Sequence, residues 1–294
     1  ISPWDPTSKK KSPELTIFRT MKLLVVFSLL LASVLAFPGH LENRITGGEV
    51  AKPHEFPYIV GIYTTIPAEY DFEADIHTWC GASLISDEYV ITAGHCVYEI
   101  PSAVLFIGAH NILNSGEERT LIPVTDKDFI PHPKYDHGKS LNDIALIKLP
   151  VKVKFSKKIQ KINLPKPSQE YDALEGRMAT ISGWGKTGDY KETSDVLRFV
   201  QLRVLENSIC RVKFPYNFVS SVMLCMDGSH KKSACPGDSG GPLVIEEKDG
   251  SKTLIGITSF GSVRGCDVNI PGVFTRVSSY LMWIWKTTGI HIRE

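Results

Sequence analysis

The sequence predicts an all-β fold with one helix near the C-terminus. Short apolar or β-branched segments recur along most of its length, and clusters of Gly, Pro, Asn and Asp separate them. The composition is that of an ordinary globular protein, with 43% hydrophobic and 22% charged residues. A helical pattern stands out near the C-terminus. Many short strands at regular spacing fit either a β-sandwich or β-barrels.

The strand predictions depend on apolar and β-branched content bounded by turn residues. The segments concerned are 58–63, 82–85, 89–92, 104–107, 144–147, 178–181, 200–204, 243–245, 254–257 and 273–277. A connector is expected near residues 164–169, which are rich in Pro. At the end of the chain, Ser278 or Ser279 can cap a helix that continues through residues 280–285 and stops near Gly289. Its apolar content predicts packing on the core, with a membrane or partner surface as the less favoured alternative.

The N-terminal part is not expected to belong to the folded protease domain. Residues 21–36 are typical of a signal peptide, since the basic Lys22 is followed by a short apolar run from Leu23 to Leu35 with small residues at its end. A membrane anchor is the rival interpretation, but a spanning helix needs ~20 apolar residues. Residues 1–20 precede Met21 and are interpreted as an upstream leader or a cloning artefact, or else as a disordered extension. The protein is therefore predicted to be secreted.

Charge and cysteine content narrow the class of partners and the compartment. The chain has 33 basic and 32 acidic residues, a formal net charge of +1, so neither nucleic acid nor an anionic membrane is an expected partner. Its six cysteines form an even set, which in a secreted chain predicts three disulfides without specifying their pairing. A zinc site is the competing interpretation, but no two cysteines have Cys-x-x-Cys spacing. No Asn-x-Ser/Thr sequon occurs.

The segment 235–242, Cys-Pro-Gly-Asp-Ser-Gly-Gly-Pro, is the strongest indication of chemistry. A serine hydroxyl is a poor nucleophile unless a base takes its proton and donors stabilise the oxyanion. The glycines that flank Ser239 leave its approach open and let the backbone turn. A plain glycine-rich turn is the alternative. Two other segments oppose it: residues 91–96 contain His95, and residues 142–149 begin with Asn-Asp143 and continue as an apolar strand.

Together, these three segments resemble the chymotrypsin-like serine protease family. The resemblance extends from Ile45 to about the C-terminus, with one small departure, Gly94 in place of alanine. It implies two six-stranded antiparallel Greek-key barrels with a C-terminal helix and an active site in the cleft between the barrels. His95 and Asp143 would belong to the first barrel and Ser239 to the second. It also implies the disulfides Cys80–Cys96, Cys210–Cys225 and Cys235–Cys266.

The resemblance assigns roles to individual residues. His95 would act as general base and then general acid, and Asp143 would orient its imidazole. Ser259 is similar to the family residue that hydrogen-bonds this aspartate. The backbone N–H groups of Gly237 and Ser239 would form the oxyanion hole. Pro236 stands where the family has a longer flexible side chain.

Activation follows from the same resemblance. The bond between Arg44 and Ile45 is similar to the zymogen cleavage site of the family, with residues 37–44 as propeptide and residues 45–294 as the protease domain. Cleavage by a trypsin-like protease would free an α-amino group with a pKa of ~8. That amine would pair with Asp238 and order the neighbouring loop.

Specificity is predicted from the residues that match the family's pocket. Ser233 occupies the base, where a trypsin-like enzyme has aspartate, and Gly261 and Gly272 match the walls. These residues are closest to those of chymotrypsins and predict cleavage after large apolar residues. Asp267 opposes this prediction, because turned inward it could admit a basic side chain, and so does the insertion Gly-Ser-Val-Arg-Gly before Cys266.

Two other segments bear on substrates and metals. The acidic segment 68–75 is longer than the family's loop and is interpreted as solvated, or alternatively as favouring basic or collagen-like sequences after the scissile bond. Residues 108–111 lack the first carboxylate of the family's calcium loop, although Glu117 and Glu118 remain. No cofactor and no metal are expected.

The sequence thus predicts a secreted, zymogen-activated, chymotrypsin-like serine endopeptidase. The alternatives are an elastase- or collagenase-like protease and, less favoured because the triad is intact, a non-catalytic homologue that binds or regulates other proteins. Expected partners are protein and peptide substrates, an activating trypsin-like protease and protein protease inhibitors. A monomer is the default state.

Overall fold

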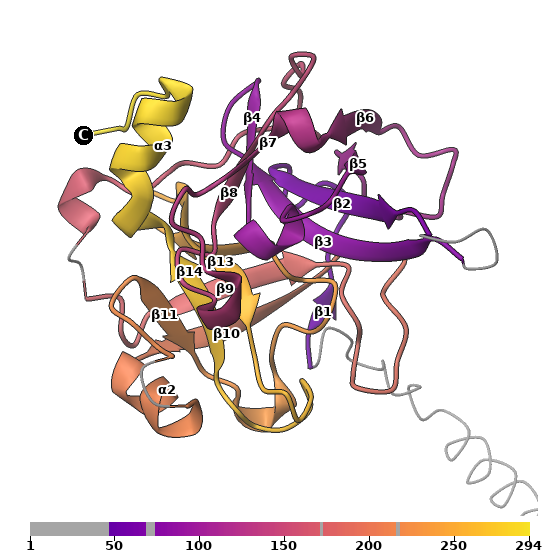
Figure 1. Cartoon of the computed structure of the whole chain (residues 1–294). Coiled ribbons are helices and arrows are strands. Elements are labelled where there is room, and N and C mark those ends of the chain that lie inside the picture. The colour runs from indigo at the N-terminus through magenta and orange to yellow at the C-terminus, as the bar shows by residue number, and fades with distance from the viewer. Residues whose placement is uncertain (1–46, 69–73, 171–172, 216–217) are drawn as a thin grey trace, which may run out of the picture. The chain divides into compact units, whose positions relative to one another are not determined.

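Two antiparallel β-sheets contain almost all of the regular structure (Figure 1). The computed structural model describes residues 47–68, 74–170, 173–215 and 218–294. The predicted leader, signal peptide, propeptide and cleavage site lie outside these residues, as does most of the acidic segment 68–75.

The first sheet is built from the N-terminal half of the protease domain. Its strands are β2 (Ile59–Ile66), β3 (Ile76–Leu84), β4 (Tyr89–Thr92), β5 (Ser102–Ile107), β6 (Thr120–Thr125), β7 (Phe129–Pro131) and β8 (Ala145–Lys148). They pair in the order β6-β5-β2-β3-β4-β8-β7. The two outermost strands, β6 and β7, are consecutive in the chain and are separated only by a 3₁₀ turn at Asp126–Asp128. The sheet must therefore curl until its edges approach each other, which makes it a half-barrel.

The second sheet closes on itself. Its strands are β1 (Glu49–Val50), β9 (Met178–Gly183), β10 (Arg198–Leu205), β11 (Met223–Met226), β12 (Pro242–Glu246), β13 (Lys252–Phe260) and β14 (Gly272–Arg276). The order is β1-β10-β11-β14-β13-β12-β9, and an additional pairing of β9 with β10 completes a ring of six strands. Strand β1 is attached outside that ring through β10. The predicted architecture of two barrel-like antiparallel sheets with a C-terminal helix is confirmed, with the second sheet a closed six-stranded barrel and the first a half-barrel.

Every segment predicted as a strand overlaps an observed one, but several elements were not predicted. Strands β1, β6, β7 and β11 and helix α2 (Asn207–Lys213) are short or carry polar residues on the exposed side, so their apolar signal is weak. The C-terminal helix α3 (Leu281–Thr288) starts later than predicted, after a 3₁₀ turn at Val277–Tyr280. Neither Ser278 nor Ser279 caps it with a side-chain hydrogen bond. The helix ends at Gly289, as predicted, and this glycine adopts the left-handed conformation.

The two sheets meet at a pair of glycines. A Cβ atom on Gly81 of β3 would lie 2.7 Å from the Cα atom of Gly241, so neither position has room for a side chain. The N–H of Gly81 donates a hydrogen bond of 2.7 Å to the carbonyl of Ser239. The turn that carries Ser239 is thereby fixed against the first sheet by main-chain atoms.

Candidate active site

The turn that carries His95 follows β4 and is held by a disulfide and a hydrogen bond. Cys80 of β3 is bonded to Cys96, and the Thr92 hydroxyl donates to the carbonyl of Gly81 at 2.8 Å. The departure at Gly94 has a steric explanation. A Cβ atom there would lie 3.0 Å from the Tyr135 ring, which covers this residue. Glycine at this position therefore leaves space for the Tyr135 ring, against which the methyl group of an alanine would press.

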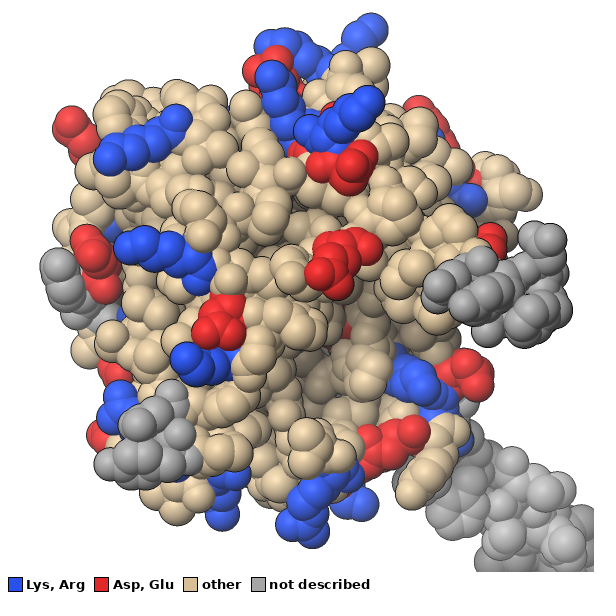
Figure 2. Space-filling model, in the orientation of Figure 1, with Lys and Arg blue, Asp and Glu red and all other residues tan. Residues whose placement is uncertain are grey.

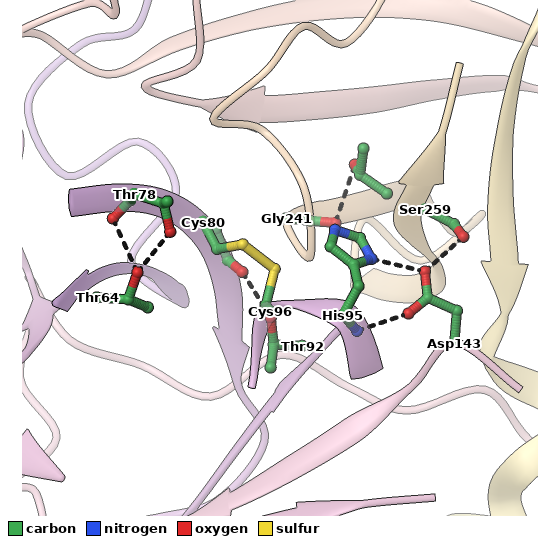
Figure 3. The surroundings of a disulfide bond; sticks show 11 residues. Thr64, Thr78, Cys80, Thr92, His95, Cys96, Asp143, Gly241 and Ser259 are labelled. Atoms are coloured by element: carbon green, nitrogen blue, oxygen red, sulfur yellow. Dashed lines mark hydrogen bonds and ion pairs between the residues drawn. A yellow bond between two sulfur atoms is a disulfide. The ribbon is translucent and has the colours of Figure 1, made fainter. Parts of the chain in front are cut away.

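Asp143 precedes β8 and is almost completely buried beside His95 (Figure 3). Its Oδ1 accepts a hydrogen bond from the backbone N–H of His95 at 3.0 Å, and its Oδ2 lies 2.9 Å from Nδ1 of the imidazole. The Ser259 hydroxyl donates to the same Oδ2 at 2.6 Å. Burial alone would raise the pKa of Asp143, but the hydrogen bonds from His95 and Ser259 outweigh burial and hold that pKa below its usual value.

This arrangement determines the tautomer of a neutral His95. A carboxylate can only accept hydrogen bonds, so Nδ1 carries the proton that faces Asp143, and Nε2 is left as an acceptor. The second sheet also positions Asp143, because the Thr275 hydroxyl of β14 donates to its carbonyl at 2.7 Å. The acid and the imidazole are therefore fixed by residues from both sheets.

Ser239 lies in a tight turn whose shape requires glycine. Gly237 has a φ of +99° and Gly240 a φ of +76°, both in the left-handed region. A Cβ atom on Gly240 would lie 2.1 Å from the Thr92 hydroxyl. Ser239 is half-buried in the wall of a cavity that Ser259 also lines. Within the described residues, no hydrogen bond joins its hydroxyl to His95, and such bonds often tighten only when substrate binds.

Two backbone donors in this turn are uncommitted. Asp238, Gly240 and Gly241 donate their N–H groups to backbone carbonyls. By contrast, no acceptor within the described part of the chain receives the N–H of Gly237 or of Ser239. These two amides belong to the residues predicted to form an oxyanion hole.

Asp238 is a buried carboxylate with two backbone donors and, among the described residues, no bonded cation. It is 0% exposed and accepts hydrogen bonds from the N–H of Gly185 at 2.8 Å and of Cys235 at 3.0 Å. Burial raises its pKa to about 6, although the two hydrogen bonds oppose the increase. A Cβ atom on Gly183 or on Gly185 would collide with this carboxylate, so both glycines are needed to admit it.

The cavity beside Ser239 has a volume of about 390 Å³ and opens on a hollowed face where basic and acidic side chains are interspersed (Figure 2). Its lining includes the predicted pocket residues Ser233, Gly261 and Gly272. Ser233 is buried, and its hydroxyl lies within hydrogen-bonding distance of the carbonyls of Ala234 (2.7 Å) and Cys266 (3.1 Å). The lining therefore has a neutral group at the position predicted to be the base.

An acidic residue that the sequence analysis missed also lines this cavity. It is Asp189, in the loop between β9 and β10, and its two carboxylate oxygens accept hydrogen bonds from the N–H groups of Cys266 and Asp267. Asp267, which the sequence singled out, is not part of the lining; its carboxylate accepts a hydrogen bond from the N–H of Asp189 at 3.3 Å. No local motif marks Asp189, because its neighbours come from a segment 77 residues further along the chain.

The disulfides are the three pairs that the family resemblance implies: Cys80–Cys96, Cys210–Cys225 and Cys235–Cys266. Within the described residues, the single group of side chains close enough to hold a metal is Cys80, His95 and Cys96. Its two sulfurs are joined to each other and offer no thiolate.

The loop that resembles a calcium site is closed by a carboxylate of the chain. The two oxygens of Glu117 accept hydrogen bonds from the N–H groups of His110 and Asn111, each at 2.7 Å.

In the described ranges, no helix has both the length and the apolar character needed to cross a membrane.

Comparison with known proteins agrees with this geometry. The sequence pattern of the family named Trypsin matches residues 45–284. A collagenase of Hypoderma lineatum is 36% identical over 92% of this chain and 99% of its own length. A chymotrypsin of Phaedon cochleariae is 37% identical over 82% of this chain and 81% of its own length. A solved structure of an HL collagenase, 35% identical, covers 84% of this chain and all of the solved chain with a TM-score of 0.74.

The chain belongs to the trypsin family of chymotrypsin-like serine proteases. This relationship confirms the predicted fold and the predicted enzyme class, a serine endopeptidase that acts on protein substrates.

Proposed function

We propose that this chain is a secreted serine endopeptidase, made as a precursor and activated by cleavage after Arg44, which cuts peptide bonds after large apolar residues. In this proposal His95, Asp143 and Ser239 form the catalytic triad. Family membership and the hydrogen bonds between Asp143 and His95 support these assignments. The three disulfides support secretion, because such bonds persist in oxidising compartments.

The chemistry follows from the free Nε2 of His95. As the Ser239 hydroxyl attacks the peptide carbonyl carbon, Nε2 takes its proton and the carbonyl oxygen becomes an oxyanion. The uncommitted N–H groups of Gly237 and Ser239 donate to that oxygen. The protonated imidazole then delivers its proton to the leaving amine, and water repeats the sequence to release the acyl group. Asp143 keeps Nδ1 protonated and stabilises the imidazolium.

The state of Asp238 supports activation by cleavage. Among the described residues no cation pairs with this buried carboxylate, and burial raises its pKa to about 6. Cleavage between Arg44 and Ile45 creates an α-amino group that is mostly charged at neutral pH. Pairing of this amine with Asp238 would stabilise the turn that contains Gly237 and Ser239. A trypsin-like protease is the expected activator, since the bond follows arginine.

One observation carries the specificity proposal, namely the neutral, hydrogen-bonded Ser233 in a cavity whose walls include Gly261 and Gly272. A large apolar side chain can enter such a cavity without leaving a charge unpaired, whereas a basic one would meet no carboxylate at Ser233. The test is kcat/KM of the cleaved enzyme on two peptides that differ only in Phe or Arg before the scissile bond. We expect Phe to be preferred at least tenfold, and a preference for Arg would overturn the pocket assignment.

A collagenase-like activity is the second candidate, favoured by the identity to the Hypoderma lineatum collagenase. Incubation with native triple-helical collagen below its melting temperature tests it. Discrete fragments would support this candidate, whereas cleavage of denatured collagen alone would support general digestion after apolar residues.

The non-catalytic alternative has a direct test. A fluorophosphonate probe should label the chain after cleavage at Arg44 and should fail to label the Ser239→Ala variant. Absence of labelling in the cleaved, correctly oxidised wild type would contradict the enzyme assignment. Protein protease inhibitors that occupy the same site are expected partners, and a monomer is the expected state.

A further inference from the structure

Two aspartates from different loops bind each other's backbone at the edge of the cavity. Oδ1 of Asp189 accepts a hydrogen bond from the N–H of Cys266 at 2.6 Å, and Oδ2 accepts a longer one from the N–H of Asp267 at 3.4 Å. In return, Oδ2 of Asp267 accepts from the N–H of Asp189 at 3.3 Å. We call this set of three hydrogen bonds the aspartate clamp.

Glycines on both sides let the clamp form. Gly265 has a φ of +118°, and a Cβ atom there would lie 2.2 Å from the Asp189 carboxylate. Gly188 has a φ of +156°, and a Cβ atom there would lie 3.0 Å from the Asp267 carboxylate. Each carboxylate therefore occupies the space that a side chain on the opposite loop would need. The sequence combines Gly188-Asp189 with Gly265-Cys266-Asp267 to bring the two loops into contact.

The loop that carries Asp189 is firmly attached at its base, where β9 ends and β10 begins (Figure 1). The N–H of Gly185 donates to Asp238 at 2.8 Å, and the N–H of Lys186 donates to the carbonyl of Pro236 at 2.8 Å. A β-bridge joins Lys186 to Thr193 on the other side of the loop. Asp189 is thus held from a base that is bonded to the turn carrying Ser239.

The segment that Asp189 holds is bonded to its surroundings at few points, among them the Ser233 hydroxyl, which donates to the carbonyl of Cys266 at 3.1 Å, and the N–H of Lys231, which donates to Oδ1 of Asn269 at 2.7 Å. Residues 261–271 lie between β13 and β14 and have no strand partner. A Cβ atom on Gly261 would meet no atom within 4 Å, so this side of the cavity is open. The covalent attachment is the Cys235–Cys266 disulfide, which fixes one point of the segment. The clamp adds bonds at Cys266 and Asp267, one residue apart.

We propose that Asp189 is a specificity-determining positioning residue, which fixes the cavity wall at Gly265 and Cys266 and thereby sets how tightly a large side chain is held. This inference rests on the proposed function, because it assumes that the cavity binds the side chain before the scissile bond. A hydrogen bond to a charged acceptor is stronger than one between neutral groups, so removal of the carboxylate frees the wall. A substrate with a small side chain does not touch that wall and is insensitive to its position.

The experiment compares Asp189→Ala and Asp189→Asn with wild type on two peptides that differ only in Phe or Ala before the scissile bond. Asp189→Ala should lower kcat/KM for the Phe peptide about tenfold, mainly through KM, and that for the Ala peptide less than about twofold. Asp189→Asn keeps one acceptor and should fall between wild type and Asp189→Ala. Equal losses on both peptides, or no loss on either, would overturn the proposal.

Glu192→Gln is the matched control, because Glu192 lies in the same loop, is exposed, and its carboxylate has no hydrogen bond to any described residue. It removes the same charge and should leave the ratio of the two kcat/KM values unchanged. An equal change of this ratio in Glu192→Gln would show that loop charge, not the clamp, is responsible, and would overturn the proposal.

A binding measurement separates this inference from the proposed catalysis. In the Ser239→Ala background, indole serves as an aromatic probe for the cavity. Asp189→Ala should raise the Kd for indole about tenfold. Unchanged indole affinity would overturn the inference even if wild type is active. If wild type cleaves neither peptide, the proposed function fails, whereas a weakened Kd would still support the role of the clamp in shaping the cavity.

Gly265→Ala tests the contact itself. Its methyl group would press on the Asp189 carboxylate, so part of its effect should vanish when Asp189 is already alanine. We expect the double variant to bind indole more tightly than the product of the two single effects predicts. Strictly multiplicative effects would contradict a direct contact between Gly265 and Asp189.

Discussion

Asp238 should make the stability of the uncleaved chain fall as the pH rises from about 4 to about 6. Its pKa is raised by burial from 3.8 to about 6, so the folded precursor keeps a proton that the unfolded chain has already released. The stabilisation that protonated Asp238 gives to the folded precursor is complete below the pKa of the unfolded chain. It is lost as the pH rises through the pKa of the folded chain. A shift of about 2 units corresponds to about 3 kcal/mol, of which about 2 kcal/mol falls between pH 4.5 and pH 7.5.

The assay is urea unfolding of the precursor, monitored by tryptophan fluorescence at these two pH values in the Ser239→Ala background, which prevents self-digestion. Asp238→Asn provides the comparison, because asparagine does not titrate. The loss of stability between the two pH values should be about 2 kcal/mol larger with Asp238 than in the Asp238→Asn variant. This comparison uses the slope alone, so a constant cost of the amide against the two backbone donors does not affect it.

Cleavage after Arg44 should remove this pH dependence, because the new α-amino group favours the charged carboxylate and lowers its pKa. Cleaved Ser239→Ala protein should therefore gain stability relative to the precursor at pH 7.5 and much less at pH 4.5. The reasoning is refuted if the precursor loses stability equally with Asp238 and with asparagine at this position.

The remaining predictions concern the triad and its surroundings. Asp143→Asn should lower kcat about 10⁴-fold with KM nearly unchanged, which is the effect of this exchange in the archetypal triad, and steady-state kinetics will measure it; a loss below tenfold would contradict the assigned role. Ser259→Ala removes the 2.6 Å hydrogen bond to Asp143 and should lower kcat several-fold, whereas Ser259→Thr, which retains a hydroxyl, should recover part of it. Gly240→Ala combines a φ of +76° with a collision at the Thr92 hydroxyl and should reduce the free energy of unfolding by roughly 3 kcal/mol or more; a cost below about 1 kcal/mol in urea titrations would argue against this packing.

The residues proposed as catalytic could be named from the sequence because each lies within its own local motif. His95, Asp143 and Ser239 are recognisable without knowledge of their distances, and so is the neutral Ser233. The family resemblance even supplied Ser259, which the structure joins to Asp143. The long apolar strands were equally accessible, because their period and composition are local properties of the chain.

The features that were missed depend on contacts between distant segments. Asp189 resembles an ordinary turn residue until the fold brings it to Cys266 and Asp267. The helix cap expected at Ser278 or Ser279 is absent because a 3₁₀ turn occupies those residues and delays α3 to Leu281. The preference of serine for the N-cap position therefore does not reveal that a 3₁₀ turn precedes the helix.

The contact between Gly81 and Gly241 has a consequence for the evolution of new substrates. The contact between the two sheets beside Ser239 is made by main-chain atoms. The distance between the sheets at this point therefore does not depend on which side chains lie on the surface. Surface loops can then lengthen, shorten or change charge while Ser239 keeps its position relative to the His95 imidazole. Because the contact between the sheets and the surface loops can change independently, relatives with names as different as collagenase and chymotrypsin can share this arrangement.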